Sequence, residues 1–230
     1  MITSTNISTN RISKFVGVLF LLSLIIPTLN WIFILSRFVS PDGNIVLEIQ
    51  NNELLFRTAI FFEIVTSIVV LALAYYLHVI LKTIDENISF LAFTMRVVEA
   101  ILTMVLAMGH FIGLLILKEE VGVSQIFINV LVGKYINLTS FLGIFMGISM
   151  LLYSYLFLKS GYIPKKLAFF GIISYLLVIM YDSTIILFPD FSSIIFIQII
   201  GGMPICFFQV IIGFWFLCKR INFTEQTNKI

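Results

Sequence analysis

The chain has 230 residues, of which 60% are hydrophobic and only 11% are charged. A soluble domain is typically about 45–50% apolar and about 25% charged, and a chain of this size could not cover its surface with so few polar side chains. The composition therefore excludes a soluble enzyme, a secreted disulfide-stabilised domain and a disordered protein. It indicates a polytopic membrane protein, whose expected partner is the lipid bilayer.

The net charge of +2 comes from 14 Lys and Arg residues against 12 Asp and Glu residues. Binding to nucleic acid needs clustered basic residues, so nucleic acid is not an expected partner. The two cysteines, Cys206 and Cys218, fall in one apolar segment. On a helix they would lie about 18 Å apart, which is too far for a disulfide, so we expect them to act as packing residues.

Six segments are long and apolar enough to cross a bilayer, which takes about 20 predominantly apolar residues. A segment exposed to lipid must satisfy its own backbone hydrogen bonds, so each is expected to be a helix. The predicted fold is therefore all-α, a bundle of six transmembrane helices between tails at residues 1–14 and 218–230. The predicted helices are Phe15–Ser36, Arg57–Leu81, Phe90–Leu117, Ile136–Leu158, Leu167–Phe188 and Ile194–Leu217.

The first segment follows Arg11 and Lys14, as the apolar core of a signal peptide would. A cleaved signal has a core of about 7–15 residues and a small-residue cleavage site. This segment is longer and has no such site, so we expect an uncleaved first helix. Residues 1–10 are rich in Ser, Thr and Asn and are predicted to lack regular structure.

The loops on the two sides of the predicted bundle differ in length. The two longer ones, Asn44–Phe56 and Ser124–Val132, are apolar and could form helices in the membrane interface; ordinary loops packed on the bundle are the alternative. The loops after the second and fourth helices are short, which predicts antiparallel neighbours for the second and third helices and for the fourth and fifth.

A polar stripe on the third predicted helix is the clearest functional signal. Arg96, Thr103 and His110 all fall within about 60° of Glu99 around the helix. Charged groups are expensive at the bilayer centre, so they should face the bundle interior. Two interpretations stay open. Arg96 and Glu99, three residues apart, could pair merely to permit insertion, or Glu99 and His110 could face an aqueous cavity and handle protons or a ligand.

Shorter polar stripes occur on other helices, and in the predicted topology they meet at similar depths. They predict one polar core inside the bundle, although uncharged members could serve only as hydrogen bonds between helices. Asp182 has no cation on its own helix, and His110 is its expected partner. The residues proposed to line this core or to form ion pairs are Glu63, Arg96, Glu99, His110, Asp182, Gln198 and Gln209, and the first helix adds Ser23, Pro27 and Asn30 on one face.

The motifs of catalytic and cofactor sites are absent from the sequence, including the nucleophile elbow and the phosphate-binding loop. A zinc site needs about three protein ligands; His110, Asp182 and Glu63 lie at similar predicted depth and could supply them, but the chain has only two histidines, which fall on different helices, and no zinc-binding motif. We therefore expect no catalytic residues, no metal and no cofactor.

Four stretches carry a family resemblance: RISKFVGVLFLLSLI, NNELLFRTAIFFEIV, FTMRVVEAIL and SGYIPKKLAFFGIISYLLVIMYDS. They are similar to a bacterial family of six-helix membrane proteins, domain of unknown function 4386, over about residues 11–220. The most specific parts are Arg96-Val97-Val98-Glu99, Ser160 to Lys165, and Tyr181-Asp182. One departure is Ala168-Phe169, where a Leu-Gly-like pair is expected. The resemblance implies six helices and makes Arg96, Glu99 and Asp182 candidate functional residues. The family has no assigned activity, so the resemblance does not indicate a substrate or a reaction.

Three functions compete. The first is binding or passage of a small amphiphile or protons through a polar cavity in the bundle. The second is a structural or regulatory membrane module without catalysis, and a distant third is an intramembrane enzyme acting on lipid. A cavity joining Glu63 to Glu99 favours the first, whereas dry, fully paired carboxylates favour the second.

The distribution of basic residues predicts that both termini are cytoplasmic. Nine Lys and Arg residues lie on the side of the termini and four on the other, and cytoplasmic loops carry the excess of these residues. Reporter fusions after Ile230 and within the Glu119–Gln125 loop should give cytoplasmic and external signals, respectively. An external signal from the C-terminal fusion would contradict this topology.

Overall fold

The computed structural model describes residues 2–39, 45–117 and 121–219. These residues contain helices and no strand. The predicted C-terminal tail from residue 220 onward, and loop residues such as Asp42 and Glu119, lie outside the described residues. The helices are α1 (Ile2–Asn30), which continues through a π-helical turn (Trp31–Leu35) into α2 (Ser36–Phe38), then α3 (Ile45–Asn51), α4 (Glu53–Leu81), α5 (Glu86–Ile116), α6 (Val121–Leu131), α7 (Tyr135–Ser160), α8 (Lys165–Leu187) and α9 (Ile195–Cys218), with a 3₁₀ turn (Pro189–Ser193) between α8 and α9.

Six of the described helical stretches are long and apolar enough to cross a membrane, and they coincide with the six predicted segments. The first of them, Arg11–Phe38, joins α1, the π-helical turn and α2. The expectation that residues 1–10 lack regular structure is wrong, because α1 begins at Ile2. Once the apolar segment has formed a helix, each further residue adds a hydrogen bond without a new nucleation step, so the polar start can continue the helix.

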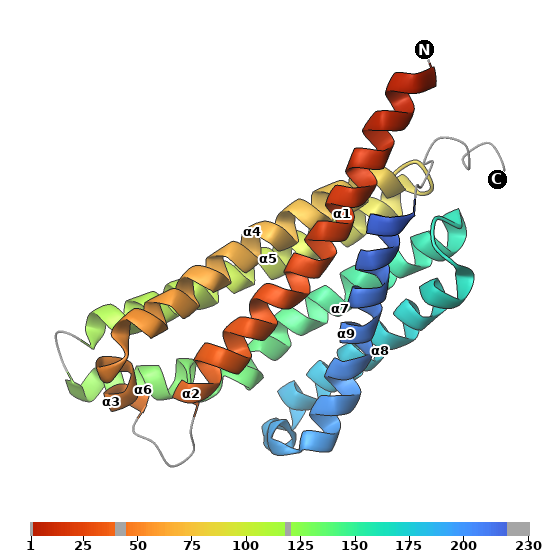
Figure 1. The fold of residues 1–230 in the computed structure, drawn as a ribbon. Helices are drawn as coiled ribbons and strands as arrows, with labels where there is room; N and C mark the ends of the chain where they lie inside the picture. Colours follow the sequence, from red (N-terminus) through yellow and green to blue (C-terminus); the bar gives the residue numbers. More distant parts are fainter. Residues whose placement is uncertain (1, 40–44, 118–120, 220–230) are drawn as a thin grey trace.

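The six long helices form a closed ring. The most extensive contacts join α1 to α4, α4 to α5, α5 to α7, α7 to α8, α8 to α9 and α9 back to α1. The predicted antiparallel pairs, α4 with α5 and α7 with α8, are therefore present. Figure 1 shows that α1 starts and α9 ends at one end of the bundle, while the short helices α3 and α6 lie at the other.

Large apolar side chains cover much of the outside of this ring. Phe61, Ile68 and Phe90 are each more than half exposed, and similar residues occur on every long helix. Soluble proteins rarely expose apolar surface so extensively, whereas lipid is the natural solvent for it. The architecture is that of a multi-pass membrane protein.

Inside the ring, the buried apolar residues form two separate clusters. One lies toward the terminal end of the bundle and includes Phe20, Leu77, Phe157 and Phe216. The other lies toward α3 and α6, and is built from residues such as Leu35, Ile49, Phe56 and Leu114. On α1, α4, α5 and α7 the stretch between the two clusters carries the polar residues. The bundle therefore has an apolar layer at each end and a polar layer between them.

Side-chain hydroxyls and amides join neighbouring helices through backbone carbonyls. In lipid such bonds average about 0.6 kcal/mol each, so they support the ring without dominating its energy. The donors are Ser13 to Phe216 O, Asn30 to Ala59 O, Ser67 to Ala100 O, Ser149 to Ala92 O and Tyr153 to Ala74 O, at 2.7–3.1 Å. The alternative that uncharged stripe residues connect helices is confirmed for Asn30 and Ser67.

The α1–α9 contact closes the ring, and it depends on glycine. A Cβ added at Gly17 would lie 2.7 Å from Gly213 O and 3.0 Å from Leu217 N, both backbone atoms of α9. Backbone atoms cannot rotate away as a side chain can, so only glycine permits the two helices to approach this closely. Small residues at such crossings are typical of helices that pack within membranes.

We expect Gly17→Ala to destabilise the bundle, because the added methyl group must push α9 away from α1. Overpacking of this kind costs about 1–3 kcal/mol, which should lower the thermal unfolding midpoint in detergent. Gly202→Ala is the matched control, since no described atom lies within 4 Å of its added Cβ. Its midpoint should be unchanged or higher. Equal midpoints for the two variants would show that the α1–α9 crossing is not tight.

Candidate functional site

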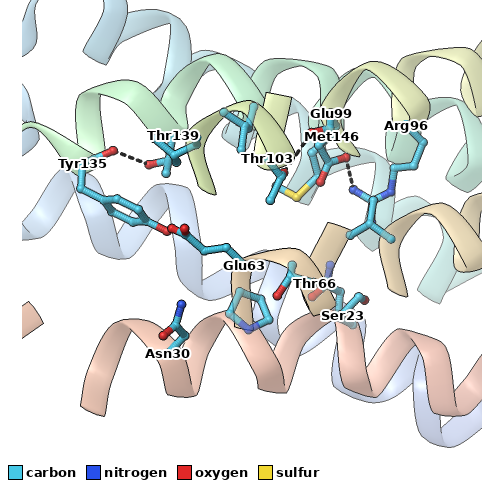
Figure 2. A pocket seen from close by; sticks show the side chains of 16 residues that line it. Ser23, Asn30, Glu63, Thr66, Arg96, Glu99, Thr103, Tyr135, Thr139 and Met146 are labelled. Carbon is cyan, nitrogen blue, oxygen red and sulfur yellow. Dashed lines mark hydrogen bonds and ion pairs between the residues drawn. The ribbon is translucent and has the colours of Figure 1, made fainter. Parts of the chain in front are cut away.

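The polar layer of the bundle contains a partly open cavity of about 220 Å³. Five of the six long helices line it, since α8 contributes no lining residue among those described. Figure 2 shows Glu63, Tyr135 and Asn30 toward one end and Arg96 with Glu99 toward the other. The lining residues are Ser23, Pro27, Asn30, Glu63, Thr66, Val70, Arg96, Glu99, Thr103, Leu106, Tyr135, Thr139, Leu142, Gly143, Met146 and Gln209.

Arg96 and Glu99 form a salt bridge within α5, as their spacing of three residues predicts. Arg96 Nη1 lies 2.5 Å from Glu99 Oε2, and the two side chains are 1% and 8% exposed. The pair therefore neutralises two charges that would otherwise be buried alone. Both residues also line the cavity, so the two interpretations of the stripe, pairing for insertion and facing a cavity, apply to the same residues.

Glu63 and His110 form a second buried pair, which joins α4 to α5. His110 Nδ1 lies 2.9 Å from Glu63 Oε2, and both side chains are almost completely buried. The other ring nitrogen, Nε2, lies 3.4 Å from the carbonyl oxygen of Leu131 on α6. The rings of Phe56 and Tyr135 flank the imidazole, with centroids 5.8 and 6.0 Å away. The imidazole of α5 is thus contacted from three other helices, α4, α6 and α7.

The predicted pairing of His110 with Asp182 is wrong, because the imidazole of His110 pairs with the carboxylate of Glu63 instead. Asp182 is buried on α8, where the hydroxyl of Ser140 on α7 lies within hydrogen-bond reach. A Cβ at Gly143 would clash with Asp182 Oδ2, so the carboxylate occupies the space that the glycine leaves open. Asp182 is not a lining residue, although Gly143 in front of it is.

The two glutamines occupy different places. Gln209 is buried and lines the cavity, and its side-chain nitrogen lies 3.5 Å from the hydroxyl oxygen of Tyr175. Gln198 is half-buried near the start of α9 and donates a hydrogen bond to Ser192 O at 2.5 Å. The structure therefore brings Glu63, Arg96, Glu99 and Gln209 together at the cavity, with His110 attached through Glu63. It leaves Asp182 and Gln198 outside the lining.

Tyr135, Thr66 and Thr139 line the cavity although the sequence does not predict them there. Tyr135 is the first residue of α7 and lies just outside the predicted apolar segment, so no hydropathy signal marks it. Thr103 was part of the predicted stripe, but Thr66 and Thr139 were not. The threonine hydroxyls donate to carbonyls of their own helices. Threonine is therefore common in membrane helices, and a pattern of charged residues does not single it out.

Three buried polar atoms at the cavity have no hydrogen-bond partner among the described residues: Asn30 Oδ1, Glu63 Oε1 and Arg96 Nε. Leaving such a group unpaired costs about 1–3 kcal/mol, and more when it is charged. Two of the three atoms are acceptors, and they belong to residues at the same end of the cavity (Figure 2). The site can therefore offer acceptors to a bound donor there.

A metal centre is not favoured by the side chains present. In the part of the chain that the structure describes, no three His, Cys, Asp or Glu side chains are close enough to hold a metal ion. The combination of His110, Asp182 and Glu63 considered from the sequence is not assembled. The chemistry that the cavity offers is hydrogen bonding and charge pairing with a small molecule.

We expect Arg96→Leu and Glu99→Leu each to destabilise the protein strongly, by about 3–5 kcal/mol, because each leaves one buried charge unpaired. The double variant should be less destabilised than the sum of the two single variants. Thermal unfolding of all four proteins in one detergent gives the coupling energy directly. Additive effects would show that the two side chains do not stabilise each other.

Comparison with known proteins gives one match. No curated protein and no solved structure is similar enough to the chain to count as a match. The profile of a family described as Domain of unknown function (DUF4386) matches residues 15–219, which include all six long helices beyond the first turns of α1. The match covers most of the chain, and it agrees with the resemblance carried by the sequence motifs. The chain belongs to the DUF4386 family.

Proposed function

We propose that this protein binds a small molecule in the cavity inside its membrane bundle, and either holds that molecule or passes it through the bilayer. The observation that carries the proposal is the cavity itself, which joins Glu63 to Glu99 and leaves three buried polar atoms without a described partner. We place the protein in the cell membrane, with both termini in the cytoplasm, on the distribution of basic residues.

The energetics of the middle layer support this proposal. Apolar side chains could fill the same space, remove the unpaired atoms and stabilise the bundle, because replacing buried polar groups by well-packed apolar ones is often stabilising. Keeping a cavity with polar walls is therefore unfavourable for the empty protein. A ligand that occupies the cavity and completes the hydrogen bonds would recover this free energy, which is the expected behaviour of a binding site.

The size of the cavity limits the ligand. Pockets for drug-sized molecules measure about 300–1,000 Å³, and this one measures about 220 Å³. Its walls include Val70, Leu106, Leu142 and Met146 as well as the charged residues, so the ligand needs an apolar body and a polar group. A small amphiphile has both features.

A structural or regulatory module remains the second candidate, because both buried pairs can be explained by insertion alone. Arg96 neutralises Glu99, and His110 gives Glu63 a hydrogen-bond partner. This alternative requires the cavity to be closed and dry. Access of small molecules to the cavity therefore distinguishes the two functions.

We expect a cysteine placed in the cavity to react with a small neutral thiol reagent. In a background of Cys206→Ala and Cys218→Ala, Ser23→Cys places the thiol at the cavity, and Ser174→Cys is the control. Both serines are buried, and both hydroxyls donate to a carbonyl of their own helix, but only Ser23 lines the cavity.

Methyl methanethiosulfonate, followed by mass spectrometry of the intact protein in lipid nanodiscs, gives the rates. Ser23→Cys should react at least about tenfold faster than Ser174→Cys, because thiol reactivity requires access and the ionised form. If both react equally slowly, the cavity is closed and the structural module is the better conclusion. Equal fast rates would show that the bundle is open throughout and has no discrete cavity.

A further inference from the structure

The geometry points to a small organic monocation as the ligand, with its ammonium group bound between Glu63 and Asn30 and its apolar body in the rest of the cavity. This inference rests on the proposed function, since it names the chemical class of molecule that the same cavity takes. It is carried by the unpaired acceptors, by the balance of charge along the walls and by the apolar lining.

The acceptors come from two residues at the same end of the cavity. Glu63 uses Oε2 to bind His110 Nδ1, and its second oxygen, Oε1, has no described partner. Asn30 donates from Nδ2 to Ala59 O at 3.1 Å, which fixes the amide and leaves Oδ1 unpaired. The exposed fractions of Glu63 and Asn30 are 4% and 3%, so the missing donors must come from a molecule inside the cavity. An ammonium group has up to three N–H donors and no acceptor, which suits this pair of oxygens.

The charged walls favour a positive ligand. Three charged side chains line the cavity, and two of them, Glu63 and Glu99, are acids. The one cation among the described lining residues, Arg96, is already paired with Glu99. An anionic ligand would have to displace Glu99 from Arg96 and then lie beside a buried carboxylate. A cation at the free oxygen of Glu63 lies away from Arg96, which is toward the opposite end of the cavity (Figure 2).

The remaining walls suit an organic cation rather than a bare ion. The phenol of Tyr135 points toward the Glu63 carboxylate (Figure 2), and an aromatic ring also attracts ammonium groups across its face. Leu106, Leu142 and Met146 supply apolar surface farther along. An apolar cavity of about 150 Å³ takes up benzene, so a cavity of about 220 Å³ accommodates a ring-sized body with a short aminomethyl group.

Three probe molecules of similar shape and size show how the charge of the ligand affects binding. Benzylammonium, benzyl alcohol and benzoate share the ring and differ in carrying a positive, neutral or negative polar group. Binding to the full chain is measured at pH 7 by equilibrium dialysis, with nanodiscs of phosphatidylcholine so that the lipid has no net charge. Empty nanodiscs correct for partition into lipid. Benzylammonium should bind saturably and at least about tenfold more tightly than benzyl alcohol, as expected for charge-assisted hydrogen bonds, and benzoate should not bind.

Glu63→Gln keeps the shape of the side chain and removes its charge. It should weaken benzylammonium binding at least about tenfold while changing benzyl alcohol binding little. Glu48→Gln on the exposed face of α3 is the matched control and should leave both affinities unchanged. Saturating benzylammonium should also slow modification of Ser23→Cys, which places the bound probe in the cavity.

The outcomes separate the two proposals. If benzyl alcohol or benzoate binds as tightly as benzylammonium and protects Ser23→Cys, the cavity binds ligands but the cation assignment is wrong. If benzylammonium binds and Glu63→Gln has no effect, the cation lies elsewhere and the assignment is again wrong. If no probe binds and Ser23→Cys is unreactive, the binding function itself fails. Should Glu63→Gln not fold, the comparison of the three probes on the unaltered protein still decides the charge preference.

Discussion

The Glu63–His110 contact joins α4 to α5 at the depth where the bundle is hollow, and the arrangement of the polar layer depends on it. Within a bilayer, water cannot replace a partner that is out of place, so a charged side chain there must meet its counterpart on a neighbouring helix or on its own. The 2.9 Å contact therefore favours a rotation and a vertical offset of the two helices that keep both side chains together. With that register set, Arg96 and Glu99 face the same interior space.

The apolar layers above and below serve the polar layer between them. The cluster around Leu77 and Phe157 fills the terminal end of the bundle, and the cluster around Ile49 and Leu114 fills the end at α3 and α6. This apolar packing lowers the effective dielectric constant between the clusters and strengthens the Arg96–Glu99 pair. It also makes an unpaired group more costly, which is why the free oxygens of Glu63 and Asn30 favour a ligand that donates hydrogen bonds.

The sequence predicts best those features that depend on a single helix. Hydropathy located six spans to within a few residues, and a spacing of three residues placed Arg96 beside Glu99, because helical geometry fixes both. The partner of His110 was predicted wrongly, since a single helix carries no information on how far its neighbour is shifted or rotated. The sequence does not predict Tyr135 at the cavity, because this residue lies one position before the apolar segment that begins at Ile136. The cavity follows from packing among five helices, which no local pattern encodes.

The contact between Gly143 and Asp182 restricts how this chain can diverge. The carboxylate lies where any side chain at position 143 would begin, so the two positions are not free to change independently. A larger residue at position 143 is tolerated only after the side chain at position 182 has become smaller. If position 143 changes first, its new side chain clashes with the Asp182 carboxylate. Because Gly143 also forms part of the cavity wall, a paired change at these sites would reshape the cavity from a helix that does not line it. Residue 182 thus gives α8 an indirect influence on the shape of the cavity.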